Sequence, residues 1–222
     1  MTERPPFEAA HNCICAFADI SILEFYQRYF DTVYIMLHPF YKEDEYGKVT
    51  QLVTWKEFVS LAGFRDIAQL DIALRNSIRG LKKKWENEED VETLMRTAHK
   101  HNIRMPSEGE FQDALKKDML IGLQEQRHHY LFIGDEFGFE RKVTYIQDLI
   151  EGKDQVTLTY GGHEVWYTNH SEILYASHWD SHFTMLCSNR KIVESILSKH
   201  PFEGFYCNEH TEIYWSLQDK EV

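Results

Sequence analysis

Apolar residues in the middle of the chain recur at steps of three and four, which is the spacing of one face of an α-helix. The clearest stretch spans residues 66–85 and predicts a long amphipathic helix. Shorter stretches with the same spacing predict helices over residues 21–30, 91–98 and 189–200. The apolar positions of the longest stretch are Ile67, Leu70, Leu74, Ile78, Leu81 and Trp85.

Polar residues at fixed offsets predict where further helices begin. A Ser or Thr followed three residues later by Glu or Gln can satisfy the first backbone N–H groups of a helix. Gly63 and Gly152 are placed to end two of these helices, because glycine readily adopts the left-handed conformation found at helix C-termini. The capping pairs are Thr54 with Glu57, Ser107 with Glu110, and Thr144 with Gln147.

Short apolar runs, which are typical of strands, dominate toward the C-terminus. Residues 32–40 and 130–134 predict buried strands, and the paired glycines 161–162 predict the turn of a hairpin. Residues 172–188 predict one long strand or two short ones. A last hairpin is expected around Asn208 and Glu209.

The order of these elements predicts an α+β fold. A helical middle region packs on a mostly antiparallel C-terminal sheet with a β-α-β-β ending. No internal repeat and no linker rich in Pro, Gly or Ser divides the sequence, so we predict a single globular domain over residues 1–222. The hydrophobic content of 43% and aromatic content of 14% supply a core and argue against disorder.

Charge and composition narrow the classes of function. A net charge of −12 argues against nucleic-acid binding, which needs a basic surface, and suits a cationic protein partner. No run approaches the roughly 18 apolar residues of a membrane helix, and residues 1–12 contain no apolar stretch typical of a signal peptide. Four cysteines in a chain of 222 residues indicate reduced thiols. We therefore expect a cytoplasmic protein.

The motif H-W-D-S-H at 178–182 is the most suggestive candidate site. If this stretch is extended, His178, Asp180 and His182 point to one face. Two imidazoles and a carboxylate suit Zn²⁺, or iron where coordination positions stay open. The alternative is that these side chains line the solvated face of a sheet. No established zinc spacing is present to decide between them.

Two further groups carry candidate thiol chemistry. His11, Cys13 and Cys15 alternate along one segment and could bind zinc or copper, unless the cysteines are buried as small apolar side chains. Cys187 with His182 and Asp180 suggests a nucleophile and base, but Cys187 has the opposite parity to His182 along a straight strand.

A basic stripe accompanies the long helix predicted over residues 66–85. It could grip a phosphate or an acidic partner, or it is simply the solvated side of that helix. The sequence contains no P-loop, no G-x-G-x-x-G and no G-x-S-x-G motif, so nucleotide-dependent chemistry has no positive support. The stripe consists of Arg75, Arg79, Lys82 and Lys83.

Several phrases of the sequence resemble an uncharacterised family of Bacillus-type proteins, DUF2711. The resemblance implies a cytoplasmic protein of similar length with no assigned activity, and it transfers no catalytic or binding residue. The phrases are L-H-P-F at 37–40, G-L-K-K at 80–83, W-D-S-H-F-T-M-L-C-S at 179–188 and E-G-F-Y-C-N-E-H-T-E-I-Y-W at 203–215.

Two functions are compatible with these observations. The first is a non-enzymatic binding or interaction protein with an acidic surface and a basic protein partner. The alternative is a metal-dependent hydrolase, or another metalloenzyme, that uses His178, Asp180 and His182 to activate water, with Glu209 or Glu212 as a base.

Overall fold

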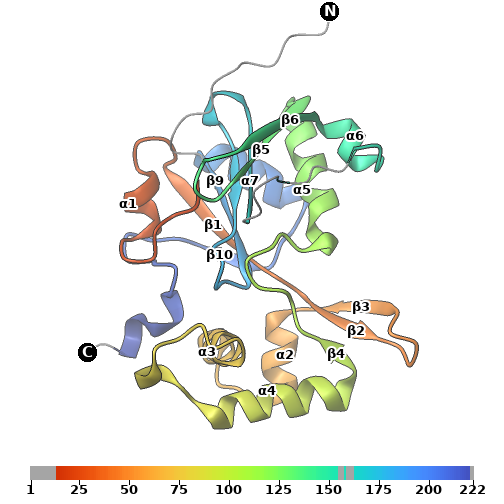
Figure 1. Ribbon diagram of the computed structural model, residues 1–222, viewed down its shortest axis with the longest axis vertical. Coiled ribbons are helices and arrows are strands. Elements are labelled where there is room, and N and C mark those ends of the chain that lie inside the picture. Colours follow the sequence, from red (N-terminus) through yellow and green to blue (C-terminus); the bar gives the residue numbers. More distant parts are fainter. Residues whose placement is uncertain (1–13, 155–157, 159–162, 221–222) are drawn as a thin grey trace, which may run out of the picture.

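The computed structural model describes residues 14–154, 158 and 163–220. Its main sheet has seven strands, all paired antiparallel, in the order β10-β1-β9-β8-β7-β5-β6 (Figure 1). The strands are β1 Thr32–Leu37, β5 Tyr130–Asp135, β6 Arg141–Tyr145, β7 Glu164–Tyr167, β8 Leu174–Ala176, β9 Phe183–Ser188 and β10 Gly204–Tyr206.

Both faces of the main sheet are covered, as β1 illustrates. All six of its residues are buried. Val33, Ile35 and Leu37 belong to one apolar cluster, whereas Tyr34 and Met36 belong to another. A strand buried on both faces loses the polar alternation of a half-exposed strand. This explains why residues 32–37 appear as one continuous apolar run in the sequence.

Different helices contribute to the two clusters. One cluster contains apolar side chains of α5, α6 and α7, and the other contains those of α1, α2, α3 and α4. The helices are α1 Ile22–Tyr26, α2 Trp55–Ala62, α3 Ile67–Ser77, α4 Glu88–His101, α5 Asp113–Glu125, α6 Ile146–Ile150 and α7 Arg190–Lys199. Short 3₁₀ helices span Lys83–Trp85, Asn169–Ser171 and Trp215–Lys220.

A second, smaller sheet lies with α2, α3 and α4 in the lower part of Figure 1. It consists of β2 Phe40–Glu43, β3 Val49–Val53 and β4 Ile103–Arg104 in the order β3-β2-β4. Local sequence explains where α2 begins and ends. The predicted capping box of Thr54 and Glu57 is confirmed, and Gly63 ends the helix with φ of 73°.

Two helix predictions in the middle region are wrong in their bounds. The helix predicted over residues 66–85 ends at Ser77, because Arg79 adopts φ of 60° and the N–H of Gly80 returns to the carbonyl of Arg75. The capping box predicted at Ser107 does not form. Gly109, with φ of 69°, keeps that segment out of a helix, and α5 begins only at Asp113.

The predicted short helix near residue 146 forms as α6, but its cap differs from the prediction. Thr144 lies within β6, and its hydroxyl donates to the carboxylate of Asp154. The residue before the helix is Tyr145, which makes no side-chain capping bond. Gly152 follows the helix with φ of 68°, as glycine at this place allows. The hairpin turn predicted at 161–162 lies outside the described residues.

The C-terminal end corrects the predicted last hairpin. Within the described residues no strand follows β10. The amide oxygen Oδ1 of Asn208 accepts from the backbone N–H of His210 over 2.9 Å, and the carbonyl of Asn208 accepts from the N–H of Thr211 over 3.1 Å. This turn directs the chain away from the sheet and into the last 3₁₀ helix, which contacts α3. The α+β class is confirmed, with a β-α-β ending in place of β-α-β-β.

Candidate functional site

The segment with the three predicted metal ligands is a turn, not a strand. β8 ends at Ala176 and β9 begins at Phe183. Between them, the backbone N–H of Ser181 donates to the carbonyl of His178 over 2.9 Å. Residues 172–188 thus form two short strands, the second of the two predicted alternatives. The condition that residues 178–182 are extended is not met, and strand alternation does not align the three side chains.

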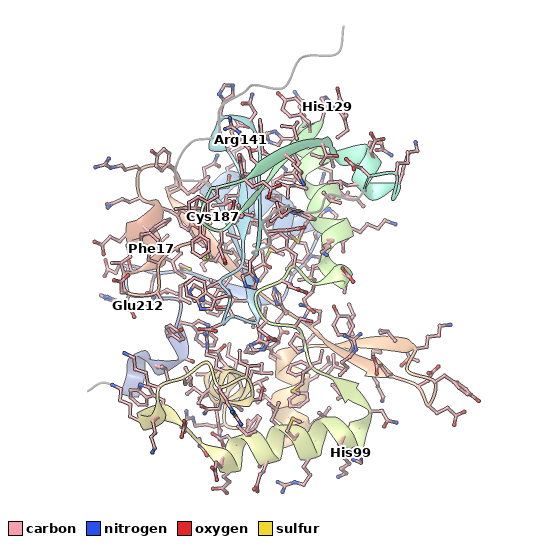
Figure 2. The ribbon with its side chains drawn as sticks, in the orientation of Figure 1. Phe17, His99, His129, Arg141, Cys187 and Glu212 are labelled. Carbon is pink, nitrogen blue, oxygen red and sulfur yellow. The ribbon has the colours of Figure 1, made fainter. Side chains whose placement is uncertain are left out.

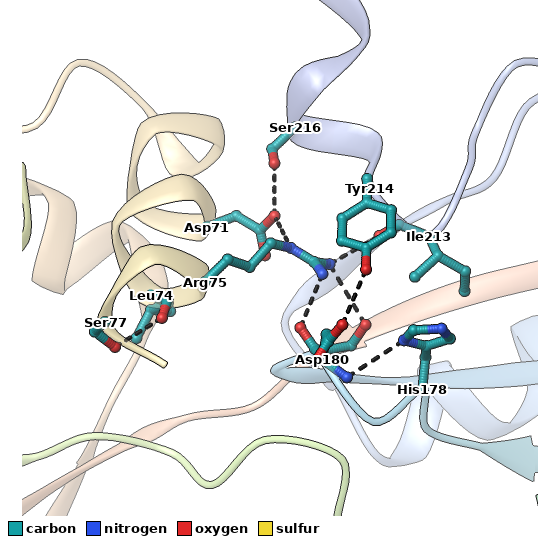
Figure 3. A network of polar contacts seen from close by, with 10 residues as sticks. Asp71, Leu74, Arg75, Ser77, His178, Asp180, Ile213, Tyr214 and Ser216 are labelled. Carbon is teal, nitrogen blue, oxygen red and sulfur yellow. Dashed lines mark hydrogen bonds and ion pairs between the residues drawn. The ribbon is translucent and has the colours of Figure 1, made fainter. Parts of the chain in front are cut away.

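Arg75 is the centre of the polar contacts at this turn, and its side chain is fully buried (Figure 3). The prediction that it belongs to a surface stripe is wrong, because it lies on the inner side of α3. Its three nitrogens all donate hydrogen bonds. Nε donates to Oδ2 of Asp71 (2.7 Å), Nη1 to the carbonyl of Asp180 (2.8 Å), and Nη2 to the carbonyl of Ile213 (2.8 Å) and Oγ of Ser181 (3.4 Å).

Asp71 links the same network to the end of the chain. Its Oδ2 also accepts from Oγ of Ser216 over 2.6 Å. Its Oδ1 is buried and has no hydrogen-bond partner among the described residues. The ion pair of Asp71 with Arg75 is shielded from water, so each charge depends on the other for compensation. The network therefore joins α3, the β8–β9 turn and residues 213–216.

Tyr214 extends the network toward the surface. Its hydroxyl donates to Oδ2 of Asp180 over 2.9 Å, and its ring lies 4.7 Å from the guanidinium carbon of Arg75. Burial raises the pKa of Tyr214 to about 12, and the hydrogen bond to Asp180 and its charge add to the shift. The phenol is therefore a neutral donor at physiological pH.

Three buried histidines surround this region and are neutral. Burial lowers the pKa of His38, His178 and His182 to about 3 in each case. The charge of Arg75 lowers the pKa of His178 and of His182 further, and the neighbouring His182 does the same for His38. The positive charge near these three neutral histidines is therefore that of the Arg75 guanidinium.

The ring nitrogens of these histidines differ in their partners. Nε2 of His38 lies 2.9 Å from Oγ1 of Thr184, and Nδ1 of His178 accepts from the N–H of Asp180 over 3.3 Å. Nε2 of His178 and Nδ1 of His182 are buried with no partner among the described residues. Such unsatisfied atoms are rare in protein interiors and indicate places where a bound species could be held.

The structure does not assemble the predicted metal ligands into a cluster. Among the described residues, no group of three or more His, Cys, Asp or Glu side chains is arranged to hold a metal ion. The carboxylate of Asp180 is bound by Tyr214.

Of the cysteines among the thiol candidates, the structure describes Cys15 and Cys187. His11 and Cys13 lie outside the described residues. Cys15 is buried, and its burial raises the pKa of its thiol. Cys187 lies in the interior of β9 (Figure 2) and belongs to the apolar cluster that also includes Val33.

A cleft of about 970 Å³ opens beside Tyr214. Residues 18–24, 80–85 and 208–217 contribute to its walls, and Figure 2 shows Glu212 between α1 and the C-terminal 3₁₀ helix. We call it the acidic cleft because carboxylates outnumber cations in its lining. Its charged lining residues are Asp19, Glu24, Glu209 and Glu212 against Lys82 and Lys84, together with His210.

Sequence reasoning missed both the buried ion pair and the cleft. The ion pair did leave a signal, since Asp71 and Arg75 are four residues apart on a predicted helix, a spacing at which side chains meet. The cleft left none, because its walls come from three segments far apart in the sequence, residues 18–24, 80–85 and 208–217, and the last of these was predicted as a hairpin.

The chain has recognisable relatives. Residues 18–217 match the family described as "Protein of unknown function (DUF2711)". The uncharacterized protein YwbB of Bacillus subtilis (strain 168) is 22% identical over 179 residues, which cover 80% of this chain and 78% of YwbB. No solved structure matches the chain significantly. No helix among the described residues is long and apolar enough to cross a membrane. Because residues 18–217 make up most of the chain and include both the β8–β9 turn and the described lining of the acidic cleft, the chain belongs to the DUF2711 family.

Proposed function

We propose that this protein is a non-enzymatic binding protein that receives a basic segment of a protein partner in the acidic cleft. The observation that carries the proposal is the charge of the lining. Four carboxylates converge there from two distant parts of the chain, against two ammonium groups. The net charge of −12 adds a long-range attraction for a cationic partner, which raises the rate of encounter.

The aromatic residues of the cleft suit the same ligand. Trp85 and Tyr214 both line it, and each ring already lies against a cation of the protein. The Nζ atom of Lys84 is 4.6 Å from the ring centre of Trp85. Aromatic faces attract ammonium and guanidinium groups. An arginine of a partner would replace Lys84 at the ring of Trp85, and its guanidinium would pair with Glu209 or Glu212.

Binding of a defined basic probe tests the proposal. The probe is an acetylated and amidated octapeptide in which arginine and serine alternate, and its counterpart replaces arginine by glutamate. We expect isothermal titration calorimetry at low salt to detect the arginine peptide alone. The affinity should fall as salt rises, since the contacts are ionic and partly exposed.

Paired charge variants locate the binding. The double variant Glu209→Gln/Glu212→Gln should weaken the arginine peptide by about tenfold, because two partly exposed ion pairs contribute roughly 0.5–1 kcal/mol each. The matched control Glu89→Gln/Glu92→Gln removes the same charge from exposed positions of α4. Equal loss in both variants would show non-specific attraction to the net charge and contradict a site in the cleft.

A metalloenzyme is the second candidate function. The observation that favours it is the pair of buried ring nitrogens without partners, Nε2 of His178 and Nδ1 of His182. Against it, the third predicted ligand, Asp180, accepts the hydrogen bond of Tyr214. Elemental mass spectrometry on tag-free protein decides the question. Near-stoichiometric zinc or iron that disappears in His178→Ala/His182→Ala would favour the metalloenzyme, whereas metal-free folded protein would exclude it in practice.

A further inference from the structure

The outer edge of β3 is an unprotected strand edge. β3 pairs with β2 on one side, and the described residues place no strand on the other. Its first four residues are exposed, including Val49 and Leu52 at 39% and 43%. The strand V-T-Q-L-V contains no charge and no proline, the devices that usually keep sheet edges from pairing with other chains.

A groove of about 540 Å³ lies over one face of the small sheet, and Gln51 and Val53 of β3 belong to its lining. It is bounded by the small sheet, by α2 and by the C-terminal end of α4, and we call it the α2 groove. Leu61 of α2 is exposed to 45% within it and offers an apolar contact. The residues that matter for recognition are Lys42, Gln51, Val53, Lys56, Leu61 and His101.

The α2 groove carries positive charge in an otherwise acidic protein. Within the described residues, neither the ammonium of Lys42 nor that of Lys56 forms an ion pair. The single carboxylate of the lining, Glu57, is already bound by the N–H and hydroxyl of Thr54. These hydrogen bonds lower the pKa of Glu57 and hold its charge at the start of α2. Two lysines therefore remain to receive an anionic side chain.

From the strand edge and the adjoining charges, we propose that β3 and the α2 groove bind an extended, carboxylate-bearing segment of a partner protein. The segment adds to β3 as a further strand, so that backbone hydrogen bonds supply affinity. Because side chains alternate along a strand, every second residue faces the groove. There an apolar side chain packs on Leu61, and a carboxylate pairs with Lys42 or Lys56.

A second copy of this chain fits the edge less well than such a segment. Two copies would each bring a net charge of −12 and would repel one another. Pairing through five residues also buries far less than the roughly 800 Å² per partner of a stable interface. A peptide segment needs no such area, and its carboxylates are complementary to the groove.

The test uses an acetylated and amidated octapeptide in which valine and glutamate alternate, labelled for fluorescence anisotropy. Two further peptides carry N-methyl groups on the backbone, one at all odd residues and one at all even residues. Only alternate N–H groups of an added strand point to β3. We therefore expect one methylated peptide to lose binding at least tenfold and the other to retain it. Equal behaviour of the two, or no binding of the unmodified peptide, would overturn the proposal.

Charge variants and oligomeric state complete the test. Lys56→Glu should weaken the unmodified peptide by about tenfold, since an attraction becomes a repulsion. Lys117→Glu, at an exposed position of α5, makes the same charge change elsewhere and should leave affinity within twofold. Equal effects of both variants would overturn the site. Light scattering that shows a dimer, together with no binding of the unmodified peptide, would assign the edge to a second copy instead.

Discussion

Arg75 and Asp71 lie one helical turn apart on the buried side of α3, with Nε of the guanidinium 2.7 Å from Oδ2 of the carboxylate. Neither side chain is exposed to solvent. The remaining guanidinium donors reach the carbonyls of Asp180 and Ile213. The pair thus connects α3 to the β8–β9 turn and to Ile213. The ring of Tyr214 lies against Arg75 and its hydroxyl binds Asp180, so the same contacts fix a residue that lines the acidic cleft.

Replacing Arg75 alone should destabilise the fold strongly. In Arg75→Met the carboxylate of Asp71 stays buried without its counter-ion, and two carbonyls lose their donor. We expect a loss of about 3–5 kcal/mol in the free energy of unfolding. Urea unfolding followed by circular dichroism measures it. A loss below about 1 kcal/mol would show that water reaches the pair.

The matched control removes both charges together. Asp71→Leu/Arg75→Met leaves no buried ion, so its cost should be clearly smaller than that of Arg75→Met. The carbonyls of Asp180 and Ile213 remain without donors, so the double variant should still be less stable than the wild type. If the double variant is less stable than the single one, the network stabilises the fold mainly through packing and hydrogen bonds, and not through charge compensation.

Local signals predicted the elements whose causes are local. The capping box at Thr54 and the left-handed Gly63 fix α2 within ten residues of sequence, and both appear in the structure. The helix predicted over residues 66–85 failed because apolar spacing continues past the point where Arg79 turns the backbone. The spacing of apolar residues shows which face of a segment is buried. It does not show at which residue the backbone leaves the helical conformation.

The candidate site was much less predictable. The residue types and spacing at 178–182 suggested a metal site. The positions of these side chains, however, depend on a turn that is held by contacts with distant parts of the chain. Arg75 reaches Asp180 across 105 residues of sequence. On a helical pattern an arginine beside apolar positions looks solvated, since burial of a charge is rare without a partner. The partner is visible only once the chain is folded.

Tyr214→Phe tests the contact between the acidic cleft and the buried network. The variant keeps the ring beside Arg75 and removes only the hydroxyl that donates to Asp180. We expect a loss of about 1 kcal/mol of stability, because the acceptor is a carboxylate and the site is half-buried. Spectrophotometric titration supplies a second readout. The tyrosine ionisation near pH 12 should diminish in the variant.

Gly204 is required by the close approach of β10 to β1. A Cβ atom at this position would lie 1.8 Å from the carbonyl oxygen of Ile35, which is a backbone atom that cannot yield without breaking the pairing. Gly204→Ala should therefore cost about 3 kcal/mol or more. Thermal or urea unfolding measures this loss.

Gly47→Ala is the matched control for this glycine. Gly47 has φ of 77° and nothing within 4 Å of the added carbon, so only backbone strain opposes the change. We expect a cost of about 1 kcal/mol. Similar losses in both variants would mean that the edge strand β10 adjusts to the extra carbon.

Acid should destabilise the protein well above the pH at which carboxylates titrate. His38, His178 and His182 have pKa values near 3 when folded, against an ordinary value of 6.5. The unfolded chain therefore binds these protons first. Stability is complete above about pH 6.5 and falls as the pH drops toward 3, by about 1.4 kcal/mol per pH unit for each histidine once the unfolded residue is protonated.

Urea midpoints of metal-free protein between pH 8 and pH 4.5 measure this dependence. Three histidines predict a limiting slope of about 4 kcal/mol per pH unit. His38→Gln keeps a polar atom near Oγ1 of Thr184 but cannot bind a proton, so its slope should be smaller by about one third. A wild-type profile that is flat from pH 8 to pH 5 would mean that these imidazoles gain a proton without unfolding, which requires water or an anion to reach them.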